Sequence, residues 1–311
     1  VNNEPLDLNT CKSVDNFRRE LNMKEGWYKR TFSATLKNDV IINVEVVRFL
    51  SLDFYEVGAI NYSVTPINTN ATIVFKPYLD AGIKNNDSNW DDQFWNITKI
   101  EANKNKAFIE SYTMKTNFHV CTFMESLCFV NNRAISLSPK ISEEIDRINF
   151  SYEKNIQAED TFSLHKFGGY TVDRNHDKLQ LINVTTRTLD AVISLGFDEL
   201  LNKQRASWKL IWDMADITIQ GDVKAQQAIR FNIFQLNQTY LGTDARLNIG
   251  PKGFTGEKYG GSTYWDTEAY CIPFYMATKD QTVARNLLTY RYHHLEKAIE
   301  NAKALGFSNG A

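Results

Sequence analysis

The sequence predicts a multidomain β + α protein in which an antiparallel β-sandwich comes first and helices follow. Short segments of alternating apolar and polar residues recur from Phe32 to about residue 172, which is typical of half-buried strands. Polar turns separate these segments at regular intervals, as expected for an antiparallel sandwich. Around residues 173–177 the apolar spacing changes to that of helices, and it keeps this spacing to the end of the chain.

The strands are assigned from their period of two. Ile42, Val44 and Val46 alternate with polar residues, whereas Val47 and Phe49 continue one residue out of phase. An extra residue in a strand produces such a change of phase, so a β-bulge is predicted there. Further strands are expected around residues 60–64, 73–75, 118–124 and 148–152.

The helices are assigned from apolar spacing and from capping residues. Helical spacing is first clear between residues 189 and 212. Asp222 is the expected N-cap of a helix from residue 223 to about 240. The last helix is expected to begin after Asp280 and to end at Gly306. A single apolar stripe is predicted along this last helix, formed by Ala284, Leu287, Leu288, Leu295, Ala298, Ile299, Ala302 and Leu305.

Composition excludes several classes of partner and site. Lys and Arg total 35 against 37 Asp and Glu, so there is no basic footprint for nucleic acid. No apolar run approaches the length of a membrane-spanning helix. The 4 cysteines are scattered without a CxxC motif, which predicts buried thiols in a reducing compartment, and hence the cytoplasm. The chain starts with Val1 and shows no signal peptide, so we expect it to begin within a longer or processed protein.

The most informative segment is a glycine-rich run that starts at Gly250 and leads to Trp265 and Asp266. Five of the chain's 15 glycines lie within residues 250–261, and such density lets a backbone pass close to a ligand. The indole of Trp265 offers a flat apolar face, and the adjacent carboxylate is a strong hydrogen-bond acceptor. A sugar has apolar C–H faces and hydroxyl groups, so the run predicts a carbohydrate site.

Other interpretations of this segment remain open from the residues alone. The run could be a purely structural loop, but its spacing fits neither the P-loop nor the dinucleotide-binding pattern. Thr263 and Asp266 match a capping box, in which Asp266 would serve a helix start instead of a ligand. Glu268 is expected on a different face of that helix, so it cannot pair with Asp266 as a facing acid and base. Pro273 is expected to kink the same helix.

The remaining candidates give weaker predictions. Residues 80–92 are rich in carboxylates and amides but do not match an EF-hand loop, so no metal site is predicted. The histidines, including His119, His293 and His294, have no metal-binding or catalytic spacing. A GxSxG motif is absent from the sequence, which argues against serine-esterase chemistry.

Residues 246–268 closely resemble the start of the catalytic domain of glycoside hydrolase family 65. The resemblance extends to residues 16–27 and 284–292, so it covers nearly the whole chain. In that family a β-sandwich leads through linking helices into an (α/α)6 barrel. The resemblance therefore implies an incomplete sandwich at 1–175, a helical linker at 176–218 and the first barrel helices at 219–311.

The resemblance also implies an activity and a role for two residues. In the family's W-D-x-E segment the Trp and Asp bind the non-reducing glucosyl unit, which here means Trp265 and Asp266. The likeness is greatest to members that phosphorolyse maltose with inversion to β-glucose 1-phosphate and glucose. Phosphate is then a co-substrate, no cofactor is expected, and a homodimer is a further family expectation. Alternatives are a family hydrolase, a phosphorylase of trehalose, kojibiose or nigerose, or a non-catalytic sugar-binding module.

The resemblance implies that no catalytic residue lies within this chain. The general-acid Glu and the phosphate-binding residues of the family lie further along the sequence, beyond Ala311. We therefore expect a fragment that lacks both ends of its parent enzyme and is inactive alone.

Overall fold

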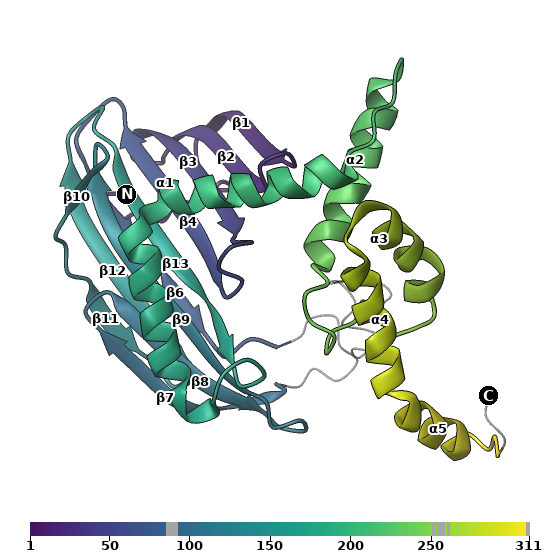
Figure 1. The fold of residues 1–311 in the computed structure, drawn as a ribbon. Coiled ribbons are helices and arrows are strands. Elements are labelled where there is room, and N and C mark those ends of the chain that lie inside the picture. Colours follow the sequence, from purple (N-terminus) through teal and green to yellow (C-terminus); the bar gives the residue numbers. More distant parts are fainter. Residues whose placement is uncertain (85–92, 251–252, 254–258, 260–261, 309–311) are drawn as a thin grey trace. The chain divides into compact units, whose positions relative to one another are not determined.

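The computed structural model describes residues 1–84, 93–250, 253, 259 and 262–308. The chain divides into two compact units, which are described separately. The first contains residues 1–84 and the chain from 93 to 208, and the second contains the chain from 209 onward. Figure 1 shows the strands of the first unit in purple to teal and the helices of the second in green to yellow.

The first unit is an antiparallel β-sandwich, as predicted. Among the described residues, the larger sheet has nine strands in the order β1-β2-β3-β4-β13-β9-β8-β7, with β10 paired to β9. The smaller sheet has four strands, with β12 between β11 and β5 and also paired to β6. The larger sheet contains β1 (Ser13–Asn22), β2 (Trp27–Thr35), β3 (Ile41–Leu50), β4 (Val57–Pro66), β7 (Trp95–Asn103), β8 (Lys106–Thr113), β9 (His119–Val130), β10 (Arg133–Ile135) and β13 (Phe162–Val172). The smaller contains β5 (Ala71–Phe75), β6 (Tyr78–Asp80), β11 (Lys140–Glu143) and β12 (Arg147–Ile156).

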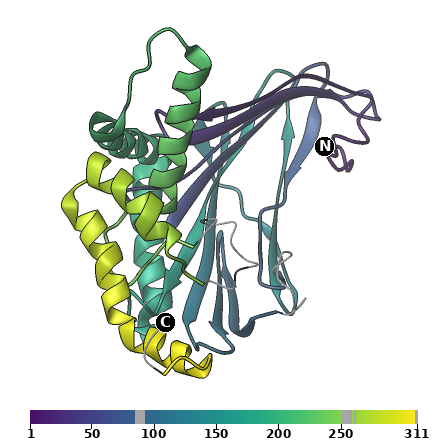
Figure 2. The same cartoon turned by 90° about the vertical axis from the view of Figure 1, so that its right-hand side faces the viewer.

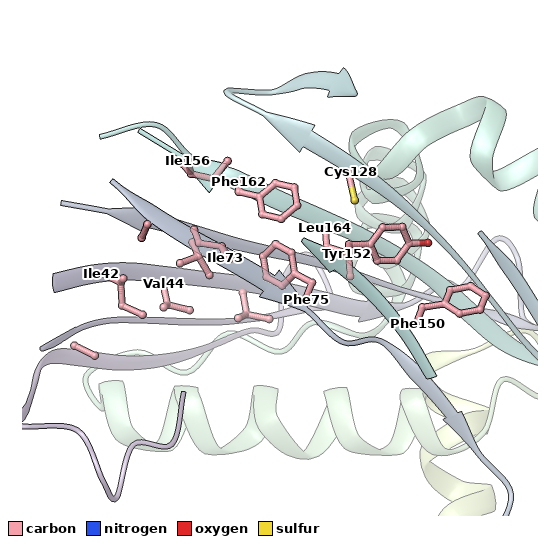
Figure 3. Close-up of a cluster of buried hydrophobic side chains, with 14 of the residues drawn as sticks. Ile42, Val44, Ile73, Phe75, Cys128, Phe150, Tyr152, Ile156, Phe162 and Leu164 are labelled. Atoms are coloured by element: carbon pink, nitrogen blue, oxygen red, sulfur yellow. The ribbon is translucent and has the colours of Figure 1, made fainter. Parts of the chain in front are cut away.

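The main core lies between the two sheets (Figure 3). Ile42 and Val44 of β3 and Leu164 of β13 meet Ile73 and Phe75 of the smaller sheet there. These side chains are fully or almost fully buried, because alternate residues of each strand point to the same face. The period of two read from the sequence therefore predicted the inward residues of β3 and β5 correctly, whereas in the strand expected around residues 118–124 the buried positions include Cys121 and Phe123, which lie in the opposite phase to Phe118 and Val120.

The β-bulge predicted near Val47 is wrong. The ladders of β3 with β2 and with β4 run through this region without a shift of register. Phe49 is apolar because it faces a second core on the opposite side of the sheet, formed with helix α1. A strand that is covered on both faces carries apolar residues in both phases. Two strands, β1 and β2, also begin before Phe32, where the sequence showed no alternation.

Helix α1 (Leu181–Ala215) covers part of the larger sheet. Its residues Leu189, Val192 and Leu200 pack on Phe123 and Phe167. Both views show the N-terminal half of α1 against this face of the larger sheet (Figures 1 and 2). The helix is interrupted at Gly196, whose φ of 77° and ψ of 172° are not helical. This conformation is essentially restricted to glycine. The short 3-10 helix η1 (Lys178–Gln180) precedes α1.

The second unit is helical, and several predicted caps are confirmed. It contains α2 (Val223–Thr239), the π-type helix η4 (Thr267–Cys271), α3 (Ile272–Thr278), α4 (Gln281–His293) and α5 (Leu295–Ala304). The carboxylate of Asp222 accepts a hydrogen bond from the Ala225 N–H, and that of Asp280 accepts one from the Thr282 N–H. Gly306 ends α5 in a left-handed conformation (φ 94°), as expected for a C′ residue.

The single last helix expected from the sequence is wrong, because the chain breaks at His294 into α4 and α5. Of the predicted stripe, Ala284, Leu287 and Ala302 are buried, whereas Leu288 and Leu295 are exposed. In α2 the buried positions are Ile233, Phe234 and Asn237.

The expectation of buried thiols holds for Cys121 and Cys128, whereas Cys11 and Cys271 are only half-buried. All four cysteines carry free thiols, and burial raises the pKa of Cys121 to about 11 and that of Cys128 to about 12. Within the described ranges, none of the helices is both long and apolar enough to cross a bilayer.

Candidate functional site

Trp265 and Asp266 lie directly before η4, at the end of the glycine-rich run. The carbonyl of Trp265 accepts hydrogen bonds from the N–H groups of Glu268 (3.1 Å) and Ala269 (3.0 Å), which closes the first turn. Most of the glycine-rich run, including Lys252, lies outside the described residues. The site can therefore be built from the run's two ends and from the helices that hold them.

The capping role considered for Asp266 is not realised. Asp266 has helical backbone angles (φ −54°, ψ −35°), and its side chain makes no capping hydrogen bond. Thr263, the other half of the expected capping box, instead accepts a hydrogen bond from Arg291. None of the described residues donates a hydrogen bond to the Asp266 carboxylate, so its oxygens can accept hydrogen bonds from a ligand.

Trp265 is 68% exposed and forms a pair with Tyr270, which is equally exposed. The ring centroids are 6.1 Å apart and the rings are tilted by 38°. A π-type turn closes from residue i to i+5, as seen where the Ile272 N–H donates to the Thr267 carbonyl. The wider turn reduces the angle between residues five apart, and Tyr270 lies beside Trp265. The sequence did not indicate Tyr270, because a regular α-helix would separate the two.

The π-type turn directly precedes Pro273, where the sequence predicted a kink. Proline has no N–H to donate, and its ring collides with the carbonyl four residues earlier in a regular helix. The wider turn is the local departure from α geometry at this position, and the chain resumes as α3 at Ile272.

A guanidinium from α4 holds the segment in place. Arg291 donates through Nε and Nη2 to the two oxygens of Glu268, at 2.7 and 3.0 Å. It also donates through Nη1 to the Thr263 hydroxyl (2.8 Å) and through Nη2 to the Tyr264 carbonyl. Glu268 is thereby occupied in an ion pair, which agrees with the expectation that it does not act together with Asp266.

Buried contacts anchor both ends of the glycine-rich run. The Thr267 hydroxyl donates to the carbonyl of Ile249 (3.0 Å), so the residue before the run is tied to the first turn of η4. Ile249 and Tyr275 belong to the core of this unit, and the Tyr275 hydroxyl donates to the Leu236 carbonyl of α2 (2.8 Å). These contacts fix where the run leaves and re-enters the helical unit.

The ionisable groups around the segment favour binding over nucleophilic chemistry. Burial raises the pKa of Cys271, and the carboxylates of Glu268 and Asp266 raise it further. The thiol therefore stays protonated near neutral pH and is a poor nucleophile. Within the described part of the chain, no group of His, Cys, Asp or Glu is arranged to hold a metal ion. The carboxylate-rich segment predicted to be metal-free lies largely outside the described residues, since 85–92 are not among them.

The sequence matches the profiles of a known protein family. The profile for the glycosyl hydrolase family 65 N-terminal domain matches residues 1–211, which is more than half of the chain. The chain belongs to glycosyl hydrolase family 65. The profile for the central catalytic domain of the same family matches residues 230–311, so the described site lies at the start of that domain.

Several characterised relatives of this family 65 chain are disaccharide phosphorylases. It is 39% identical to a maltose phosphorylase of Bacillus subtilis over 98% of its own length and 40% of the relative's. It is 29% identical to an alpha,alpha-trehalose phosphorylase of Thermoanaerobacter brockii, with 98% and 40% covered. The structure of a putative kojibiose phosphorylase from human microbiome superposes on 97% of this chain and 38% of its own, with a TM-score of 0.86 and 28% identity. The chain thus spans about 40% of the length of the curated relatives.

Proposed function

We propose that the protein containing this chain phosphorolyses maltose, with inversion, to β-glucose 1-phosphate and glucose. The proposal is supported by the higher identity to the Bacillus subtilis maltose phosphorylase (39%) than to relatives that act on trehalose or kojibiose (29% and 28%). The relatives named as phosphorylases support the broader class, in which inorganic phosphate is the co-substrate, and we propose that no cofactor takes part.

Trp265 and Asp266 form part of the subsite for the glucosyl unit in this proposal. The observation that carries it is the Asp266 carboxylate, which caps no helix although it lies at a helix start beside an exposed indole. The indole face packs against the apolar C–H face of the sugar, and the carboxylate accepts hydrogen bonds from sugar hydroxyls. Charge-assisted hydrogen bonds of this kind are stronger than neutral ones, so Asp266 orients the ring.

The reaction needs two further groups that we place outside the 311 residues. A carboxylic acid protonates the glycosidic oxygen while phosphate attacks the anomeric carbon from the opposite face, which inverts its configuration. Because the general acid lies elsewhere in the parent protein, this chain alone is inactive. We also propose a cytoplasmic location, consistent with four free thiols, and a homodimeric parent.

The experiment that tests the activity uses the product of the complete gene with maltose, in the presence and absence of phosphate. The expected result is phosphate-dependent formation of β-glucose 1-phosphate, identified by the NMR signal of its anomeric proton. Glucose release without phosphate would instead support a family hydrolase. Parallel reactions with trehalose, kojibiose and nigerose assign the substrate, and a higher kcat/KM for one of them would overturn the choice of maltose.

Calorimetric titration of the 311-residue chain with maltose separates the enzyme from a sugar-binding module. We expect no measurable heat of binding, because the remaining parts of the pocket belong to residues beyond this chain. A micromolar Kd would contradict this expectation and support a chain that binds sugar by itself.

A further inference from the structure

We propose that Arg291 is the positioning residue of the Trp265–Asp266 segment, so that its guanidinium sets the orientation of both side chains toward a sugar. The sugar-binding role of Trp265 and Asp266 rests on the proposed function, whereas the contacts that Arg291 makes around them do not. Arg291 touches neither side chain through a hydrogen bond; it acts through the residues on either side of them.

The contacts of Arg291 enclose the segment along the chain. Thr263 and Tyr264 precede Trp265, and Glu268 follows Asp266 by two residues. One guanidinium therefore holds the segment at both ends through a hydroxyl, a carbonyl and a carboxylate. With both ends fixed, the backbone of the three intervening residues, 265–267, has little freedom to rotate, and the direction of the Trp265 and Asp266 side chains follows from it.

Arginine is chemically suited to this arrangement. A guanidinium is planar and carries five N–H donors in a rigid fork, so it can bind a carboxylate through two parallel bonds and still donate to other acceptors. Both oxygens of Glu268 accept hydrogen bonds from Nε and Nη2 of Arg291. The Thr263 hydroxyl accepts one from Nη1, and the Tyr264 carbonyl accepts one from Nη2. A lysine at this position would keep the charge, but its three N–H donors on one nitrogen cannot make the four hydrogen bonds that Arg291 makes.

The ion pair is partly buried, so its effect on position has to be separated from its effect on stability. The side chains of Arg291 and Glu268 are 31% and 29% exposed. Water competes for both charges at this exposure, whereas the bidentate geometry strengthens the pair. The structure contains a comparable pair elsewhere in the same unit: Arg230 donates through Nε and Nη2 to the two oxygens of Asp216, at 2.8 and 2.7 Å. This second pair serves as a matched control, because it does not contact residues 263–268.

The first test measures the geometry in the 311-residue chain. Labelling with 5-fluorotryptophan gives a separate ¹⁹F resonance for each of the 6 tryptophans, and Trp265→Phe assigns the one of interest. We expect Arg291→Lys and Glu268→Gln to shift or broaden the Trp265 resonance and leave the others in place. Arg230→Lys should leave the Trp265 resonance unchanged. An unchanged Trp265 resonance in Arg291→Lys, with the melting temperature lowered, would overturn the positioning role.

The second test measures the consequence in the product of the complete gene. Misplacement of a binding group by about 1 Å can reduce catalysis about 100-fold, so we expect Arg291→Lys to lower kcat/KM for the disaccharide by about 10- to 100-fold. Guanidinium ion added to Arg291→Ala should restore part of this loss, whereas a structural defect would not respond. A variant with normal kcat/KM would overturn the inference. If the unmodified protein has no phosphorylase activity, the proposed function fails, and the ¹⁹F result still decides the role of Arg291.

Discussion

At the scale of single residues, Asp266 is the side chain on which the proposed function most directly depends. Its carboxylate takes part in no capping bond, so under the proposed function its replacement acts mainly through the lost contacts to the sugar. We expect Asp266→Asn to lower kcat/KM of the complete enzyme about 10- to 100-fold, because hydrogen bonds to a charged group contribute about 1.5–3 kcal/mol. Initial rates of phosphorolysis check this, with Asp213→Asn as the control, since the Asp213 carboxylate forms an exposed ion pair with Lys209 one turn away. Equal kcat/KM values for the two variants would contradict the role of Asp266.

His165 is a residue whose charge state affects the stability of the sandwich. Its ring lies 4.1 Å from that of Phe129 and 5.3 Å from that of Phe197. Burial lowers the pKa of His165 from 6.5 to about 4, against a smaller opposing effect of Asp198. Between these values the unfolded chain binds a proton that the folded chain does not, so stability decreases as pH falls from 6.5 to 4.

The prediction for His165 is a difference between two pH profiles. We expect His165→Phe to lose about 1–3 kcal/mol less stability than the unmodified chain between pH 6.5 and 4, because it cannot titrate. Denaturant unfolding at several pH values measures this difference. Parallel profiles for His165→Phe and the unmodified chain would show that the imidazole does not titrate in this range.

At the scale of elements, the break in α1 at Gly196 is a backbone feature. Nothing lies within 4 Å of the position that a Cβ would take, so a substitution meets no steric contact. The backbone angles are nevertheless those that only glycine adopts easily. We expect Gly196→Ala to destabilise the chain by about 1–3 kcal/mol, measured by denaturant unfolding. The exposed neighbour Ser194→Ala is the control and should change stability by less than about 0.5 kcal/mol. A neutral Gly196→Ala would mean that the two limbs of α1 can straighten without loss.

Several elements show how far local sequence signals reach. The caps at Asp222 and Asp280 and the end at Gly306 were predictable, because each depends on a few neighbouring residues. The break at His294 was not predictable, since apolar spacing continues across it. The regular pairing of β3 was not predictable either, because Phe49 is apolar for a long-range reason. It faces α1, which is more than a hundred residues away in sequence. The predicted domain limits at residues 175 and 218 stay a prediction.

At the scale of the whole molecule, the described helices of the second unit carry many exposed apolar side chains. Leu288 and Tyr292 lie one turn apart on α4, and both are more than half exposed. Exposed apolar surface of this kind promotes association. We therefore predict that the 311-residue chain binds the dye ANS and self-associates at micromolar concentration.

Charged substitutions test the source of this association. The double variant Leu288→Glu with Tyr292→Glu should reduce the sedimentation coefficient and the dye fluorescence of the 311-residue chain. Leu50→Glu is the matched control, since Leu50 is 79% exposed but belongs to the first unit. A larger effect of Leu50→Glu would place the association on the sandwich instead. Charge on an apolar patch acts by making its burial unfavourable, so the fold itself should be retained.

The sequence by itself determined the order of a sandwich and helices, the inward residues of β3 and β5, and Trp265 and Asp266 as the candidate binding pair. These conclusions depend on periodicity and on short motifs, which are local properties of a chain. Only the tertiary structure decided that Asp266 caps no helix, that a π-type turn brings Tyr270 beside Trp265, and that Arg291 holds the segment. Glu268 and Arg291 are 23 residues apart, and nothing in their neighbourhoods indicates that they pair. Long-range contacts of this kind arise from the packing of helices, which a local pattern does not specify.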